Sequence, residues 1–182
     1  MKKTYTLEIE QDNYPDNPRS WDNLGTMVCF HNRYNLGDKH DYQSENYDGW
    51  DDLRNTLLAN EDVHTILPLY LYDHSGITIS TKPFSCHWDS GKIGFIFISK
   101  DKVKKEGIDE SKVEDYLKSE VETYDHYLTG EVYQYKLYEV EECSLGHDHR
   151  KLVESCGGFY DEDNCREEGM NMLSIYEKEE ER

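Results

Sequence analysis

The distribution of charge along the chain constrains what it can fold into. Acidic residues outnumber basic residues by 39 to 20 over 182 residues, which gives a formal net charge of −19. Residues 106–182 contribute 23 acidic and 8 basic side chains, whereas residues 1–105 contribute 16 and 12. Highly charged chains with few aromatic residues tend to stay disordered, but this chain contains 15 Tyr, 5 Phe and 3 Trp. We therefore expect a folded single domain over residues 1–182 with a strongly acidic C-terminal part over residues 106–182.

Apolar periodicity predicts an α+β protein with a single antiparallel sheet and one principal amphipathic helix. The principal helix is expected at about residues 110–129, where Asp109 is a good N-cap and apolar residues recur at steps of three and four. A short helix is expected near residues 51–60. Alternating or continuous apolar runs predict strands at residues 4–10, 25–31, 64–72, 76–81, 93–99, 131–141, 151–155 and 172–176, followed by an acidic run at 177–182.

The principal helix carries carboxylates between its packing positions, so one side can pack while the other faces a partner. The expected partner-binding residues on this helix are Glu114, Asp115, Glu120, Glu122, Asp125 and Tyr124. Tyrosine suits such a surface because it provides a large contact area at a low entropy cost. The Tyr-rich loop over residues 34–47 and the C-terminal acids are the next candidates. The competing interpretation is a solvated acidic face that serves only solubility.

The same charge limits the classes of function. A polyanion repels phosphate and lipid head groups, so we expect neither direct nucleic-acid binding nor membrane binding. The sequence contains no glycine-rich phosphate-binding motif and no G-x-S-x-G or H-E-x-x-H motif. Cys86 and His87 are adjacent and would point to opposite faces of a strand, which disfavours a Cys/His nucleophile pair. We therefore expect a protein that is not an enzyme, with no catalytic residues and no cofactor.

Cysteine and histidine residues near the C-terminus leave one alternative open. No signal-peptide pattern precedes the first expected strand, and five cysteines are an odd number, so we expect free thiols or metal ligands in a cytoplasmic protein. The residues with zinc-ligand chemistry are Cys143, His147, His149, Cys156 and Cys165. Their spacing does not match a paired C-x2-C knuckle. A zinc-binding module or zinc-dependent enzyme built on this segment remains an alternative to a loop with unpaired thiols.

Two segments carry a resemblance to a known class of proteins. They are residues 18–27 (PRSWDNLGTM) and residues 84–91 (FSCHWDSG), the second leading into residues 93–96 (IGFI). Together with the length and acidity, they resemble small acidic proteins of phages and mobile elements, and among these the type II-A anti-CRISPR proteins. The resemblance implies a non-enzymatic inhibitor that binds the RNA-guided CRISPR effector nuclease with its guide RNA, in the cytoplasm of the bacterial host. Either the binding or the cleavage of target DNA would then be blocked.

The charge fits this expectation, because the effector holds its heteroduplex in a positively charged channel that an acidic protein can occupy. Occlusion of the DNA site and clamping of two effector domains both stay open. The same acidic helix also suits a DNA-mimic inhibitor of restriction enzymes, since duplex DNA carries one negative charge per roughly 1.7 Å of axis. An acidic housekeeping protein of a mobile element is a third interpretation.

Overall fold

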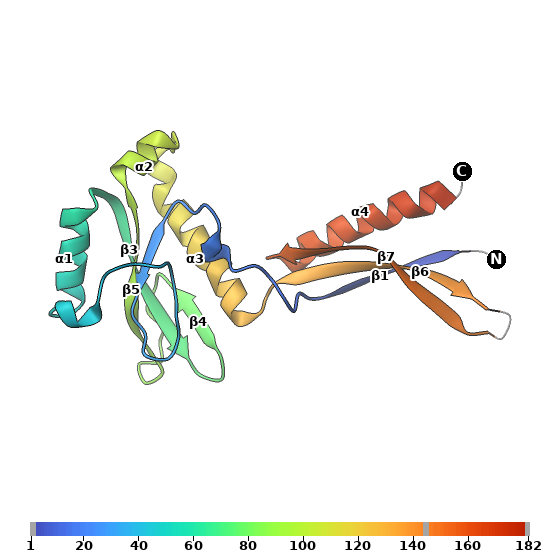
Figure 1. Cartoon of the computed structure of the whole chain (residues 1–182), viewed down its shortest axis with the longest axis horizontal. Helices are drawn as coiled ribbons and strands as arrows, with labels where there is room; N and C mark the ends of the chain where they lie inside the picture. The colour runs from blue at the N-terminus through green and yellow to red at the C-terminus, as the bar shows by residue number, and fades with distance from the viewer. Residues whose placement is uncertain (1–2, 144–145, 181–182) are drawn as a thin grey trace. The chain divides into compact units, whose positions relative to one another are not determined.

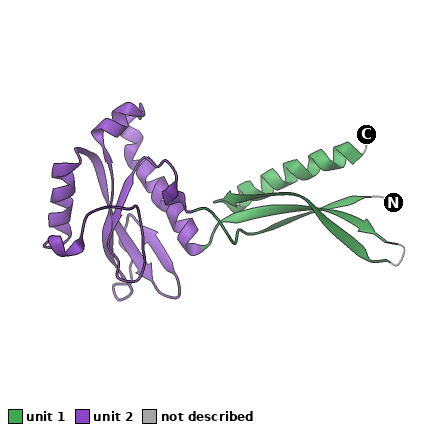
Figure 2. Ribbon diagram, in the orientation of Figure 1, with its two compact units in different colours: residues 1–16, 130–182 green, residues 17–129 purple. Residues whose placement is uncertain are grey.

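The computed structural model describes residues 3–143 and 146–180 and divides the chain into two compact units (Figure 2). Unit 1 comprises Met1–Asp16 and Gly130–Arg182, and unit 2 comprises Asn17–Thr129. Residue 106, where the predicted acidic part begins, lies inside unit 2. By sequence, unit 1 contains 19 acidic and 8 basic residues, and the longer unit 2 contains 20 and 12. Whether the chain behaves as the single domain predicted over residues 1–182 stays a prediction.

The α+β class is confirmed, but the single predicted sheet is wrong, because each unit has its own antiparallel sheet (Figure 1). In unit 2 the strand order is β2 (Thr26–Cys29), β5 (Ser90–Ser99), β3 (Val63–Asp73) and β4 (Ile77–Ser80). In unit 1 it is β1 (Thr4–Gln11), β6 (Tyr133–Glu142) and β7 (Asp148–Phe159). β1 pairs with β6, with Leu7 opposite Leu137. The first strand therefore belongs to the sheet of unit 1 and not to that of unit 2.

Unit 2 has three layers, with a helix on each face of its sheet (Figure 1). Ile96 and Ile98 of β5 pack on one face in a core that includes α3 (Val113–Thr129). Phe95 and Phe97 pack on the opposite face in a core that includes α1 (Trp50–Asn60). A strand that is covered on both faces must be apolar at every position, which explains the continuous apolar run predicted to be a strand.

Side-chain caps mark the start of α2 and of the turn before α3 in unit 2. The predicted principal helix is present, preceded by a 3-10 turn (Glu110–Lys112) at which the Asp109 side chain accepts a hydrogen bond from the Ser111 N–H. The predicted short helix is α1. One helix was not predicted: α2 (Lys100–Lys105) follows β5 directly and is capped by Ser99, whose hydroxyl accepts from the Lys102 N–H. The sequence did not indicate this helix, because it is only six residues long and most of its residues are lysines.

In unit 1, one further unpredicted helix, α4 (Glu162–Glu180), covers one face of the sheet (Figure 1). The strand predicted at residues 172–176 is wrong, because these residues and most of the acidic run after them belong to α4. Cys165 and Gly169 are buried one turn apart, and a Cβ at Gly169 would lie 2.8 Å from Leu7 Cδ1. The Tyr176 ring lies 5.5 Å from the Tyr5 ring, centroid to centroid. The strand predicted at residues 151–155 is confirmed as part of β7.

Among the residues that the structure describes, no helix combines the length and the apolar character needed to cross a membrane.

Candidate partner-binding surface

The acidic residues predicted on α3 fall into two groups that differ in exposure. Glu114, Asp115 and Glu122 are exposed. Lys118, one turn along the helix, lies 2.7 Å from the Glu114 carboxylate and 3.9 Å from that of Asp115. Exposed pairs of this kind contribute little to stability. These three carboxylates are available to a partner, and their role in binding stays a prediction.

Glu120 has a structural role. Its carboxylate accepts hydrogen bonds from the N–H groups of Leu24 at 2.6 Å and Gly25 at 3.1 Å, and from Arg19 Nη1 at 3.0 Å. The Glu120 side chain is 15% exposed and that of Arg19 only 3%. Arg19 also donates to both carboxylate oxygens of Asp38, at 2.9 and 2.7 Å. The carboxylate of Glu120 therefore fastens the segment before β2 to α3.

Burial lowers the pKa of Arg19, but its hydrogen bonds and charge interactions with Asp38 and Glu120 outweigh this effect and raise the pKa above its ordinary value. Arg19 therefore stays charged. Arg19 also belongs to residues 18–27, one of the two segments that carry the family resemblance. Within this segment Arg19 has a structural role, because it binds Asp38 and Glu120 of the same unit.

Asp125 and Tyr124 also face the rest of unit 2. The Asp125 carboxylate accepts from the Ile79 N–H at 2.7 Å, which holds α3 against the edge strand β4. Tyr124 is 2% exposed, and its hydroxyl accepts from the Gly37 N–H at 3.2 Å. Burial raises the pKa of this phenol. Tyr124 thus offers almost no surface to a partner.

A sequence signal for these structural roles was present. Leu117, Glu120 and Tyr124 are spaced by three and four residues, so the carboxylate lies on the same helical face as two buried side chains. Asp125 likewise follows the buried Val121 by four residues. A carboxylate within an apolar stripe indicates a buried, hydrogen-bonded acid rather than a contact residue.

The most acidic exposed element is α4, which was not predicted. Its 19 residues include seven acidic and two basic side chains, and all seven acidic residues are exposed. They are Glu162, Asp163, Glu167, Glu168, Glu177, Glu179 and Glu180. The sheet of unit 1 supports the opposite side of the helix, where Cys165 and Gly169 are buried. These seven residues are called the α4 acidic surface below.

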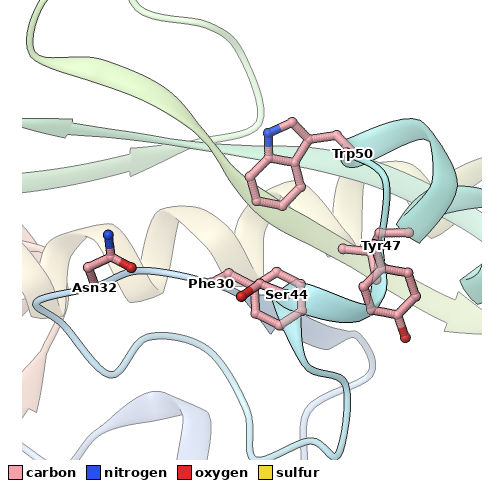
Figure 3. A pocket seen from close by; sticks show the side chains of 7 residues that line it. Phe30, Asn32, Ser44, Tyr47 and Trp50 are labelled. Carbon is pink, nitrogen blue, oxygen red and sulfur yellow. The ribbon is translucent and has the colours of Figure 1, made fainter.

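The predicted Tyr-rich loop over residues 34–47 borders a pocket of about 180 Å³ in unit 2 (Figure 3). The loop is anchored by His40, whose ring nitrogens lie 3.1 Å from the Tyr42 carbonyl oxygen and 3.2 Å from that of Cys29. The pocket is lined by Phe30, Asn32, Ser44, Tyr47, Gly49, Trp50 and Leu53. We call it the aromatic pocket, because three half-buried rings form much of its wall.

The candidate metal ligands are spread over the hairpin of β6 and β7 and over α4. The Cys143 N–H donates to the His147 carbonyl oxygen at 2.9 Å, and His149 lies opposite Glu141 in the sheet. Cys156 is exposed on β7, whereas Cys165 is buried in α4, where burial raises the pKa of its thiol to about 11. Over residues 3–143 and 146–180, no three His, Cys, Asp or Glu side chains come together in a way that would hold a metal ion.

Cys86 does not pair with a histidine. Its thiol donates to Asp89 Oδ2 at 3.7 Å, and the same oxygen lies 3.3 Å from His74 Nδ1. A Cys/His nucleophile requires a direct hydrogen bond from thiol to imidazole, whereas here a carboxylate lies next to both. Nearby, Trp88 is 96% exposed.

No protein-family model, curated protein or solved structure matches this chain. The case for its function therefore depends on these surfaces and on the resemblance of residues 18–27 and 84–91.

Proposed function

We propose that this protein is a non-enzymatic inhibitor that binds the type II CRISPR effector nuclease, loaded with its guide RNA, and blocks the binding or cleavage of target DNA. The resemblance of residues 18–27 and 84–91 to type II-A anti-CRISPR proteins suggests the partner. The mode of binding is inferred from the α4 acidic surface, which is a helix with seven exposed acidic side chains. A surface of this charge is attracted to a channel built to hold nucleic acid.

The density of charge indicates how closely this surface imitates nucleic acid. A helix of 19 residues is about 28 Å long, and duplex DNA carries about 16 phosphates over that length. The seven carboxylates of α4 supply less than half of that charge. The surface therefore supports electrostatic attraction to a basic protein better than it supports a faithful copy of the DNA backbone. This comparison favours the CRISPR inhibitor over a strict DNA-mimic inhibitor of restriction enzymes.

Exposed side chains outside α4 add specific contacts to this general attraction. Trp88 lies within residues 84–91 and is 96% exposed. An exposed tryptophan is the kind of side chain that anchors protein interfaces. Glu114, Asp115 and Glu122 of α3 are the predicted partner-binding acids that remain exposed.

The test is a binding assay between the purified chain and the effector nuclease, with and without guide RNA, over a range of salt concentrations. A variant with Glu167→Gln, Glu168→Gln, Glu177→Gln and Glu179→Gln should bind roughly tenfold more weakly or worse, because each exposed pair contributes up to about 1 kcal/mol. The control neutralises two exposed acids of unit 2, Asp101 in α2 and Glu106 directly after it, with Asp101→Asn and Glu106→Gln. This control should bind as the unchanged protein does.

Absence of any complex at low salt, both with and without guide RNA, refutes the proposal. Equal binding by the α4 variant and the control would show that the interface does not include α4. An assay in cells that compares protection against CRISPR with protection against restriction separates the two kinds of inhibitor.

A further inference from the structure

We propose that the aromatic pocket of unit 2 binds an arginine side chain of a protein partner. That the partner is a basic, nucleic-acid-handling protein rests on the proposed function. The chemistry of the pocket does not, because it follows from the rings, charges and hydrogen-bonding groups around the pocket itself.

Three aromatic side chains present their faces or edges to the pocket. The Phe30 and Trp50 ring centroids are 6.3 Å apart with 25° between their planes, and those of Phe30 and Tyr47 are 6.5 Å apart with 26° between theirs. Figure 3 shows the Trp50 ring on one side of the pocket, with Phe30, Ser44 and Tyr47 on the other. Trp50 is held from behind by Phe95, whose ring centroid lies 6.3 Å away at 73°. The face of an aromatic ring attracts a cation, and that of tryptophan does so most strongly.

The segment that frames the pocket carries a net negative charge. Residues 41–52 contain five acidic residues and no lysine or arginine, and all five acids are exposed. They are Asp41, Glu45, Asp48, Asp51 and Asp52. The Asp48 N–H donates to Asp52 Oδ2 at 3.0 Å, which fixes this segment at the start of α1. This charge disfavours an anionic ligand and favours a cationic one.

The polar groups of the pocket distinguish arginine from lysine. The side chains of Asn32 and Ser44 line it, and both contain an oxygen that can accept a hydrogen bond. A guanidinium group is planar, stacks on rings and offers five N–H donors, whereas an ammonium group is compact and strongly hydrated. Ring faces with hydrogen-bond acceptors beside them suit the planar group.

The chain already uses the same contact elsewhere. Arg150 Cζ lies 4.3 Å from the Tyr138 ring centroid in unit 1, and Lys92 Nζ lies 5.3 Å from the Phe95 centroid in unit 2. Lys92 and Arg33 line a neighbouring pocket that shares Phe30 and Asn32 with the aromatic pocket. Arg33 is paired with Asp73.

The experiment titrates the whole protein with a short peptide, acetyl-Gly-Arg-Gly-amide, and follows the Trp50 indole N–H resonance by NMR. The matched peptides contain citrulline, which has the shape of arginine without its charge, or leucine. We expect the arginine peptide to shift the Trp50 resonance saturably in the millimolar range, and the other two to bind at least tenfold more weakly. Trp50→Leu identifies the resonance and should abolish binding, while Trp21→Leu, which removes an exposed indole that does not line the pocket, should leave it unchanged.

A second variant tests the proposal independently in case Trp50→Leu does not fold. Glu45→Gln with Asp51→Asn keeps all three rings and should weaken the arginine peptide several-fold without changing the citrulline result. Equal binding of arginine and citrulline, equal binding of leucine, or shifts confined to residues other than Trp50 would each overturn the proposal. The nuclease is absent from this titration, so failure here leaves nuclease binding untouched. Failure of nuclease binding likewise leaves the selectivity of the pocket intact.

Discussion

Replacing Glu120 with alanine tests whether this residue holds the fold of unit 2 or forms part of a partner-binding surface. The substitution removes the acceptor of three hydrogen bonds, from Leu24 N at 2.6 Å, Gly25 N at 3.1 Å and Arg19 Nη1 at 3.0 Å. All three bonds join α3 to a segment about 100 residues earlier in the chain. If they hold that segment in place, the variant must be less stable.

The expected loss can be estimated from the surroundings of Glu120. Removing one partner of a buried ion pair costs about 3–5 kcal/mol, and a hydrogen bond to a charged group contributes about 1.5–3 kcal/mol. Arg19 keeps its two bonds to Asp38, at 2.9 and 2.7 Å, and a bond to the Gly25 carbonyl oxygen at 2.8 Å. Because its charge stays compensated, the lower end applies, about 3 kcal/mol. With a urea dependence of about 2 kcal/mol per M, the unfolding midpoint falls by about 1.5 M.

The assay is urea unfolding at neutral pH, followed by tryptophan fluorescence and circular dichroism. Glu114→Ala is the matched control, because it removes an exposed carboxylate from the same helix, and its midpoint should match that of the unchanged protein. Glu120→Gln keeps one acceptor oxygen but loses the charge, so it should lie between the two. If Glu120→Ala and Glu114→Ala unfold at the same midpoint, the hydrogen-bond network does not stabilise unit 2, and Glu120 returns to the list of partner-binding candidates.

Two further predictions follow from packing and burial. Gly94→Ala should severely destabilise unit 2, because a Cβ there would lie 1.9 Å from the Val28 carbonyl oxygen. Gly91→Ala in the same strand has open space around its Cβ and should be close to neutral. Thermal unfolding of both variants checks this prediction, and equal melting temperatures would contradict it. Burial raises the pKa of Cys165 from 9.0 to about 11, so its stabilising contribution is complete below pH 9 and declines as the pH rises toward 11. Urea midpoints from pH 8 to 10.5 should therefore fall less steeply in Cys165→Ala, and parallel curves would refute this account.

Local sequence patterns predicted the elements whose signals are contained within a few turns. The helix α3 could be predicted because Asp109 caps the turn before it and apolar residues recur along one face. The strand β5 could be predicted because both of its faces are covered, which requires a continuous apolar run. The pairing of β1 with β6 could not, because an alternating strand pattern gives the faces of a strand but not its partner 130 residues away.

The helix α4 was missed because its apolar residues near the C-terminal end, Met172, Leu173, Ile175 and Tyr176, form a short run that also suits a strand. The signal that distinguishes the two lies at the other end. Asp161 accepts a hydrogen bond from the Asn164 N–H at 2.7 Å, and two acidic residues follow Asp161 in the first turn. This is the pattern of a helix start.

The candidate site was predictable only in its general charge. Helical spacing places Glu120 on the same face as buried side chains of α3, but the partner of its carboxylate is Arg19, 101 residues away. No local pattern contains that information. The aromatic pocket likewise joins Phe30 to Tyr47 and Trp50 through tertiary packing. The acidic segment beside the pocket, residues 41–52, is continuous in sequence, but the residues that line the pocket come from separate segments of the chain.

The placement of acids along α4 connects the stability of the helix to the proposed binding. Glu162 and Asp163 lie at the N-terminal end, where the helix dipole favours negative charge, but Glu177, Glu179 and Glu180 lie at the C-terminal end, where the dipole opposes it. Lys178 is the one basic residue in that last turn. A basic partner that contacts this end relieves the repulsion among the carboxylates, so binding and helix stability reinforce each other. Salt screens both interactions, and it must therefore stabilise the isolated helix end while it weakens the complex.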